Sequence, residues 1–300
     1  MFEISMFGFR ALWSPYFLLF LFIITIGFFY SVFKRQQKCP NEIALTKKQG
    51  IFFILSIILL YIVKGSPVDL LGHIMFTFHM IAMAILYLLI PPLLIVSIPN
   101  WMWEQFFKVR VIRQFFQFFT KPIIALIMFN GMFSFYHVPF IFDFIKTDVI
   151  YHSVYTFVLF IFAMFMWWPL MNQYDEERQL SGLKKIGYLF ADGVLLTPAC
   201  ALIIFADSPM YATYTDPQLW AQAMKLCVPA DLLSQLTLSG PEMFNIMPAK
   251  YDQQLGGVIM KILQEIIYGS ILFVVFLQWY RKEQKDNQEN VSYEPRLLKE

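Results

Sequence analysis

The sequence is poor in charge. Charged residues make up 15% of its 300 residues, whereas soluble proteins average about a quarter, and 58% of the residues are hydrophobic. Apolar stretches close to the ~20 residues that cross a bilayer recur along the whole chain. This composition excludes a soluble globular domain and indicates a membrane protein with several helical spans.

Cysteine pairs and common catalytic signatures are also lacking. Cys39, Cys200 and Cys227 are widely spaced and form no CxxC or zinc-type pair, so no disulfide framework is predicted. The sequence contains no GxSxG, P-loop or HExxH motif. A net charge of +2 leaves no basic surplus for binding nucleic acid. These features favour neither a hydrolase nor a nucleic-acid-binding protein.

Apolar runs predict an all-α polytopic bundle of about seven transmembrane spans. The runs cover residues 14–33, 50–64, 71–98, 121–136, 150–171, 186–206 and 256–280. In the third run, Pro91 and Pro92 are expected to kink the helix or end it near the far side. The transmembrane domain thus covers residues 1–280 with a long outer loop at 207–255, and the polar residues 281–300 are predicted to form a disordered cytoplasmic tail.

Lysine and arginine alternate between the connections. The connections after the first, third and fifth spans carry Lys34, Arg35, Lys38, Lys47, Lys48, Lys108, Arg110, Arg113, Lys121, Arg178, Lys184 and Lys185. The remaining connections carry Lys146, Lys225 and Lys250. Because basic loops stay on the cytoplasmic side, we predict that the N-terminus is outside and the C-terminus inside, which fits an odd number of spans.

All four histidines fall in the predicted outer half of the membrane. His73 and His79 lie near the outer start of the third span, His137 at the outer end of the fourth, and His152 at the outer start of the fifth. Histidine inside a membrane is rare and usually functional. The shared depth therefore predicts one site at the outer face.

Methionine accompanies these histidines. Met75, His79 and Met83 follow at i, i+4 and i+8 and so share one helix face. Imidazole binds copper and thioether sulfur selects Cu(I), so a mixed set predicts a Cu(I) site. The candidate metal ligands are His73, His79, Met80, Met83, His137 and His152. Asp69, four residues before His73, is expected to orient that imidazole through its second nitrogen.

Each feature also has a structural interpretation. Methionine commonly fills packing space, a lone interfacial histidine commonly makes a structural hydrogen bond, and His137 could simply end a helix. Glu265, near the middle of the seventh span, could relay protons or bond to a neighbouring helix, and Asp192 favours a structural or interfacial role. Gly256-Gly257 is interpreted as a flexible transition from loop to helix.

Short motifs in a fixed order point to one family. They are His73 with His79-Met80 and Pro91-Pro92-Leu93-Leu94, His137-Val138-Pro139 with Asp143, His152 with Trp167-Trp168-Pro169, Leu196-Thr197-Pro198-Ala199, and Asp252-Gln253-Gln254-Leu255-Gly256-Gly257. In this order, over about residues 70–270, the sequence resembles the polytopic CtaG family, the cytochrome c oxidase assembly factors of Gram-positive bacteria. Where relatives have His-Met-x-x-His, this chain has Met83 in place of the second histidine, a softer ligand on the same face.

The resemblance implies a non-enzymatic protein of the bacterial plasma membrane that is needed to assemble heme-copper oxidase. In the leading hypothesis it holds Cu(I) at the outer face and passes it to an oxidase subunit; a further copper chaperone is another candidate partner, and the lipid bilayer surrounds the chain. The alternative is a metal-free scaffold that stabilises an oxidase subunit through aromatic-rich helices, which contain 34 Phe. A transporter or membrane enzyme that uses Glu265 ranks third, because no inverted repeat is visible.

Overall fold

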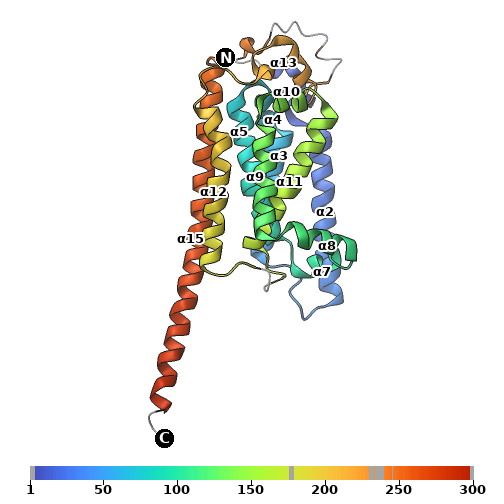
Figure 1. Cartoon of the computed structure of the whole chain (residues 1–300). Coiled ribbons are helices and arrows are strands. Elements are labelled where there is room, and N and C mark those ends of the chain that lie inside the picture. The colour runs from blue at the N-terminus through green and yellow to red at the C-terminus, as the bar shows by residue number, and fades with distance from the viewer. Residues whose placement is uncertain (1–3, 176–178, 230–232, 234–239, 245, 298–300) are drawn as a thin grey trace.

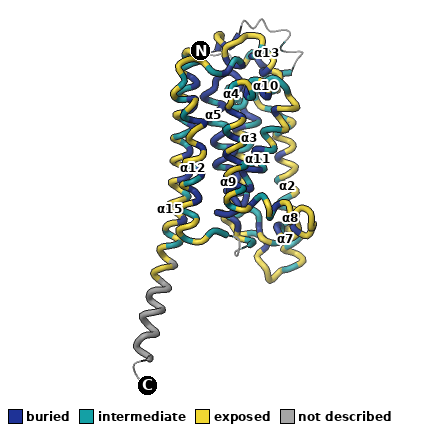
Figure 2. Tube along the Cα trace, viewed as in Figure 1, coloured by how far each residue is buried: buried dark blue, intermediate teal, exposed yellow. Residues whose placement is uncertain are grey.

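The computed structural model describes residues 4–175, 179–229, 233, 240–244 and 246–297. Over these residues the protein is helical and has no strand, which confirms the all-α prediction. Long helices stand side by side as an upright bundle, and short helices cover its two ends (Figure 1). Of the long apolar helical segments, Phe76–Ser97 is the most deeply buried, whereas α2 (Pro15–Lys38) and the outward faces of α12 (Leu183–Ile204) and α15 (Ala249–Leu297) are largely exposed (Figure 2).

Within the described residues, six helical segments are long and apolar enough to cross a membrane. They are the N-terminal segment with η1 (Ile4–Phe7), α1 (Gly8–Trp13) and α2 (Pro15–Lys38); α3 (Lys47–Gly65); Phe76–Ser97; α11 (Val149–Met171); α12 (Leu183–Ile204); and the first part of α15 (Ala249–Leu297), up to Arg281. Each coincides with one of the predicted runs.

The predicted fourth span is the short helix α9 (Pro122–Tyr136). Its 15 residues extend for only ~22 Å, less than the ~30 Å of a typical hydrocarbon core. With α8 (Arg110–Phe119) it forms a pair that is bent by 78°, and the count of spans rises to seven if this pair is one broken span. In Figure 1, α9 nevertheless runs from the end of the bundle at α8 to the end at α10.

Short helices divide between the two ends of the bundle (Figure 1). One end carries α7 (Asn100–Phe106) and α8, together with the basic connections that follow α2 and α11. The other end carries α4 (Pro67–Ile74), α10 (Pro139–Lys146), η4 (Ala212–Tyr214), α13 (Pro217–Met224) and η5 (Pro241–Met243). The separation matches the predicted alternation of basic connections, and the assignment of the α4 end to the outside stays a prediction.

A buried tryptophan lets the third span continue through two prolines. The span consists of α5 (Phe76–Ala84), a π-helical turn η2 (Ile85–Leu89) and α6 (Ile90–Ser97). Proline has no N–H, so Pro91 cannot donate to the carbonyl of Tyr87. The indole Nε1–H of Trp167 donates to that carbonyl instead, at 3.1 Å. The helix is therefore distorted in the π turn before the prolines and continues past them to Ser97.

The first turns of α15 pack closely against α5 and α12. A Cβ atom on Gly256 would lie 2.8 Å from the Phe76 ring, and one on Gly257 would lie 2.8 Å from the side chain of Ile204. Both glycines lie inside α15, so the interpretation as a transition from loop to helix is wrong. Their missing side chains let three helices approach one another, as small residues do at helix contacts in membranes.

Asp252, one turn before these glycines, caps the start of α5. Its carboxylate accepts hydrogen bonds from the backbone N–H groups of Phe76 at 2.6 Å and Thr77 at 3.2 Å. The N-cap residue of α5, Met75, makes no side-chain cap. The first N–H groups of a helix have no acceptor within it. The Asp252 carboxylate from α15 supplies the hydrogen-bond acceptors that the start of α5 lacks.

The two intramembrane carboxylates occupy different surroundings. Asp192 is buried, accepts from Asn130 Nδ2 at 2.6 Å and from the hydroxyl of Tyr268, and so ties α9, α12 and α15 together. This arrangement matches the structural role expected for Asp192. The side chain of Glu265 is 68% exposed on the surface of the bundle, where it pairs with Lys261 at 3.1 Å.

The last part of α15 differs from the expected disordered tail. The helix continues without a break beyond the apolar segment, which ends at Arg281, to Leu297, and it extends beyond the end of the bundle in Figure 1. Because a preformed helix adds each further residue without a new nucleation step, a polar segment rich in Glu, Gln and Lys can continue it.

Candidate functional site

Four elements bring the four histidines to one end of the bundle. His73 lies in α4, His79 in the first turn of α5, His137 directly after α9, and His152 in the first turn of α11. All four side chains are buried. They form two neighbouring pairs, with 5.9 Å between the ring centroids of His73 and His152 and 6.2 Å between those of His79 and His137.

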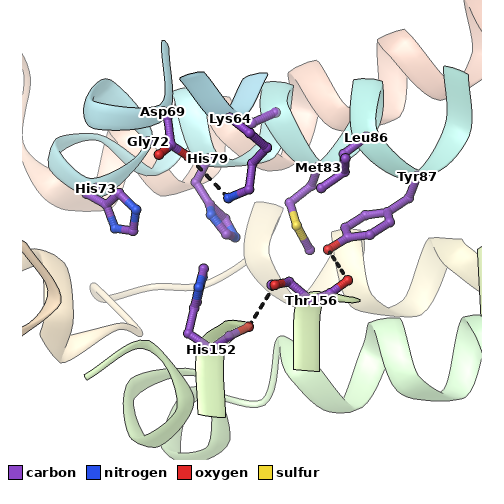
Figure 3. Close-up of a pocket in the computed structure, with 11 residues that line it drawn as sticks. Lys64, Asp69, Gly72, His73, His79, Met83, Leu86, Tyr87, His152 and Thr156 are labelled. Atoms are coloured by element: carbon purple, nitrogen blue, oxygen red, sulfur yellow. Dashed lines mark hydrogen bonds and ion pairs between the residues drawn. The ribbon is translucent and has the colours of Figure 1, made fainter. Parts of the chain in front are cut away.

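Three of these histidines line one small cavity. His73, His79 and His152 surround it together with Met83, and its volume is about 30 Å³. A water molecule needs at least ~10–15 Å³ of such space. The cavity therefore has room for an ion or a water molecule but not for an organic substrate. Figure 3 shows His79 and His152 directed toward each other from facing helices, with the sulfur of Met83 beside them.

Two buried imidazole nitrogens at this cavity, and one beside it on His137, are free to bind a ligand. Among the described residues, Nδ1 of His73, Nε2 of His79 and Nε2 of His137 are buried and have no hydrogen-bond partner. Nδ1 of His137 lies 2.8 Å from the Phe133 carbonyl oxygen. When Nδ1 donates there, Nε2 keeps its lone pair for a metal. Burial also lowers the pKa of His137 to about 4, so its ring is neutral at pH 7.

Two of the predicted roles differ from what the structure shows. Asp69 accepts from Lys64 Nζ at 3.2 Å, so its expected role in orienting His73 is wrong. Met80 does not line the cavity; it is buried against Gly256 of α15. In one continuous helix Met80 would lie two turns after His73, but the extended backbone of Met75 separates α4 from α5 and shifts the periodicity.

The donor atoms are arranged in pairs and not in a larger cluster. Among the described residues, no group of three or more His, Cys, Asp or Glu side chains is close enough to hold a metal ion. A metal lies ~2.0 Å from an imidazole nitrogen, so two rings about 6 Å apart can each direct one nitrogen at an ion between them. The arrangement fits an ion that accepts few ligands.

A family comparison matches most of the chain. The family described as cytochrome c oxidase caa3 assembly factor matches residues 26–282, a range that contains every candidate ligand. The chain belongs to this family. No curated protein and no solved structure matched it. The resemblance inferred from the ordered motifs is thus confirmed.

In this assembly factor, residues 211–214, between α12 and α15, are bonded to the end of the bundle that carries the histidines. Asp143 accepts from the backbone N–H groups of Ala212 and Thr213, each at 2.9 Å, and from the Thr213 hydroxyl at 2.8 Å. These bonds hold η4 in place, and the hydroxyl of Tyr211 then donates to the His137 carbonyl at 2.9 Å. The motif from His137 to Asp143 thereby attaches the η4 region to the site.

The assembly factor also buries a lysine that sequence reasoning missed. Lys146 is fully buried in α10, and its Nζ donates to the Gly72 carbonyl at 3.1 Å and to the Tyr214 hydroxyl. Burial lowers the pKa of Lys146 to about 7. Burial, with the nearby charge of Lys146, holds the pKa of His73 well below its usual value, so His73 is in the neutral form that metals need. The one signal in the sequence is that Lys146 is the single basic residue of its predicted connection.

We expect Lys146→Met to remove a pH dependence of stability. The pKa of about 7 lies below the ~10.4 of a free lysine, so between these values the unfolded chain binds more protons than the folded one. The free energy of unfolding should therefore rise with pH above 7, by at most ~1.4 kcal/mol per pH unit. Thermal melting of the solubilised protein between pH 7 and 9 should show this rise in the wild type and a flatter profile in the variant.

The matched control is Lys225→Met, which removes an exposed lysine at the same end of the bundle. This control should keep the wild-type slope. An unchanged slope in Lys146→Met would show that Lys146 does not titrate in this range.

Proposed function

We propose that this oxidase assembly factor binds Cu(I) among its outer histidines and delivers it to an oxidase subunit. One observation carries the proposal: unpartnered buried imidazole nitrogens and a methionine sulfur lie at a small cavity of ionic size. Nitrogen and thioether donors together select Cu(I). The cargo is a metal ion, since a cavity of about 30 Å³ excludes organic substrates.

The proposed transfer is an exchange of ligands. Cu(I) accepts two or three donors, so an ion between two imidazoles, with Met83 beside them, keeps a position open for a ligand of the receiving subunit. Neutral imidazoles bind without releasing a proton. The ion can then move between proteins with no change of oxidation state and no catalytic turnover by this chain.

The attached outer loop adds selectivity to this proposal. Tyr211 and Tyr214 of the η4 region are buried against the histidine end of the bundle, and the Tyr214 hydroxyl donates to the Gly72 carbonyl at 2.7 Å. We propose that these tyrosines keep bulk water from the His137 side of the site, which disfavours hydrated divalent ions because they give up their water reluctantly. The receiving subunit would therefore approach from this loop.

A metal-free scaffold is the second candidate function. The observation that favours it is that the described residues bring no three His, Cys, Asp or Glu side chains together. In this alternative the histidines serve packing and hydrogen bonding alone. Transport through Glu265 has no such support, because Glu265 lies on the bundle surface and is not part of the cavity lining.

A Cu(I) competition titration of the detergent-solubilised protein under reducing conditions tests the proposal. The wild type is expected to bind Cu(I) tightly and near integer stoichiometry. Replacing His73, His79, His137 and His152 together by leucine should remove that binding. Cys200→Ser, which removes a buried soft ligand of α12 outside the cavity, should keep it. Equal binding by wild type and the four-histidine variant would favour the scaffold.

A further inference from the structure

A groove runs along the bundle surface between α12 and α15. Its volume is about 490 Å³, and its lining combines small, apolar and charged residues. The residues that matter here are Gly187, Val194 and Thr197 of α12 and Lys261, Glu265 and Gly269 of α15. A Cβ atom added at Gly187 or Gly269 would meet nothing within 4 Å, so these positions are open toward the groove.

The two charges in this groove have unequal surroundings. Lys261 Nζ donates to Thr197 Oγ1 at 3.1 Å and to Gln264 Oε1 at 3.0 Å, besides its ion pair with Glu265. The side chain of Lys261 is 27% exposed, and that of Glu265 is 68% exposed. The cation is thus held by its own bundle, whereas the carboxylate faces outward and can accept further hydrogen bonds.

The depth of Glu265 makes this exposure unusual. It lies at the centre of the apolar segment Ala249–Arg281, beside the middle of α12. Charged side chains inside membranes almost always face protein or water, because hydrocarbon offers them no hydrogen bonds. A carboxylate that faces outward at this depth therefore indicates a surface that another protein covers.

We propose that this groove binds a transmembrane helix of an oxidase subunit, which brings a hydrogen-bond donor to Glu265. This inference rests on the oxidase-assembly part of the proposed function and not on copper binding. Open glycine positions admit a helix at close range. Since Lys261 is already bound within the bundle and Glu265 retains free acceptor sites, the chemistry selects a helix with a donor such as Asn, Gln, Ser, Thr or Arg at the same depth.

A second copy of this chain fits the groove less well. Membrane dimers with two-fold symmetry about the membrane normal place equivalent residues at equal depth. Two copies joined through this groove would thus bring the same groups to the same level, and neither copy would offer Glu265 a free donor, because Lys261 is already bonded to Thr197, Gln264 and Glu265. A different protein can supply the donor that a second copy lacks.

Site-specific photocrosslinking in cells tests the proposal. A photoreactive benzoyl-phenylalanine at Val194, which lines the groove and is 53% exposed, should crosslink to an oxidase subunit that specific antibodies identify. The control position is Phe157 on α11, which is 65% exposed outside the groove and should give at least fivefold less of that product. Glu265→Leu should lower the Val194 crosslink severalfold, and Glu265→Gln, which keeps an acceptor, should lower it less.

Each other outcome overturns the proposal. A Val194 crosslink to a second copy would make the groove a homodimer contact, and a yield no higher than that of Phe157 would make it a lipid-facing surface. Cu(I) binding by Glu265→Leu should equal that of the wild type. A failed copper titration therefore leaves this crosslink unaffected, and a failed crosslink leaves the copper site unaffected.

Discussion

Replacing His79 by leucine is expected to abolish the assembly of active oxidase while the protein stays inserted in the membrane. His79 faces His152 across the cavity, adjoins His137, and has a buried Nε2 without a partner among the described residues. Leucine fills similar space but supplies no donor atom. Oxidase activity in membranes from cells whose only copy is His79→Leu should fall at least tenfold, with the amount of the variant checked by immunoblot.

Met80→Leu is the matched control for this experiment. Met80 is the next residue, is equally buried, and packs against Gly256 outside the cavity. Its replacement by leucine conserves volume and should leave oxidase activity within twofold of wild type. Added copper in the medium should partly restore the His79→Leu strain if copper delivery is its defect. Wild-type activity in His79→Leu would remove His79 from the site.

Replacing Asp252 by alanine should cause the largest loss of stability. Its carboxylate accepts two buried backbone N–H groups at the start of α5, three residues before His79. Hydrogen bonds to a charged group contribute ~1.5–3 kcal/mol each, and buried donors left without partners cost more. We therefore expect the free energy of unfolding to fall by ~3–5 kcal/mol, and Asp252→Asn, which keeps one acceptor oxygen, to lose about half as much.

Thermal melting of the solubilised variants measures this loss. Asp216→Ala is the control, because Asp216 caps α13 with two N–H bonds of its own at an exposed position. An N-cap of this kind contributes only ~1 kcal/mol. If Asp252→Ala melts no lower than Asp216→Ala, the cap is not what holds α5 against α15.

Since α5 carries His79, Asp252→Ala should also lower Cu(I) affinity.

Apolar runs predicted the spans because a membrane helix needs little more than a long apolar segment with internal hydrogen bonds. The limits of the prediction lie where the chain departs from a regular helix. The run 71–98 is continuous in hydrophobicity, yet it divides at Met75. No pattern within that run shows the division, because the carboxylate that caps the new start belongs to Asp252, more than 170 positions away.

The candidate site shows the same contrast. The shared depth of His73, His79, His137 and His152 follows from their positions along the spans, and the structure places them at one end of the bundle. The exclusion of Met80 follows from its place one residue after His79 in α5, on the face toward α15, whereas the relation of α4 to α5 depends on the break at Met75. Lys146 looked like an ordinary loop residue, because burial of a lysine depends on the segments that fold over it.

By itself, the sequence determined the class of the protein, the positions of its spans, the depth of its histidines and, through motifs in order, its family. These properties depend on local composition and on position along the chain. Only the tertiary structure determined which side chains line the cavity, and which carboxylate is buried and which faces outward. It also revealed the contact that lets a helix continue through Pro91 and Pro92. Such properties depend on contacts between segments that are distant in the sequence, and hydrophobicity does not encode the partner of a given carbonyl or carboxylate.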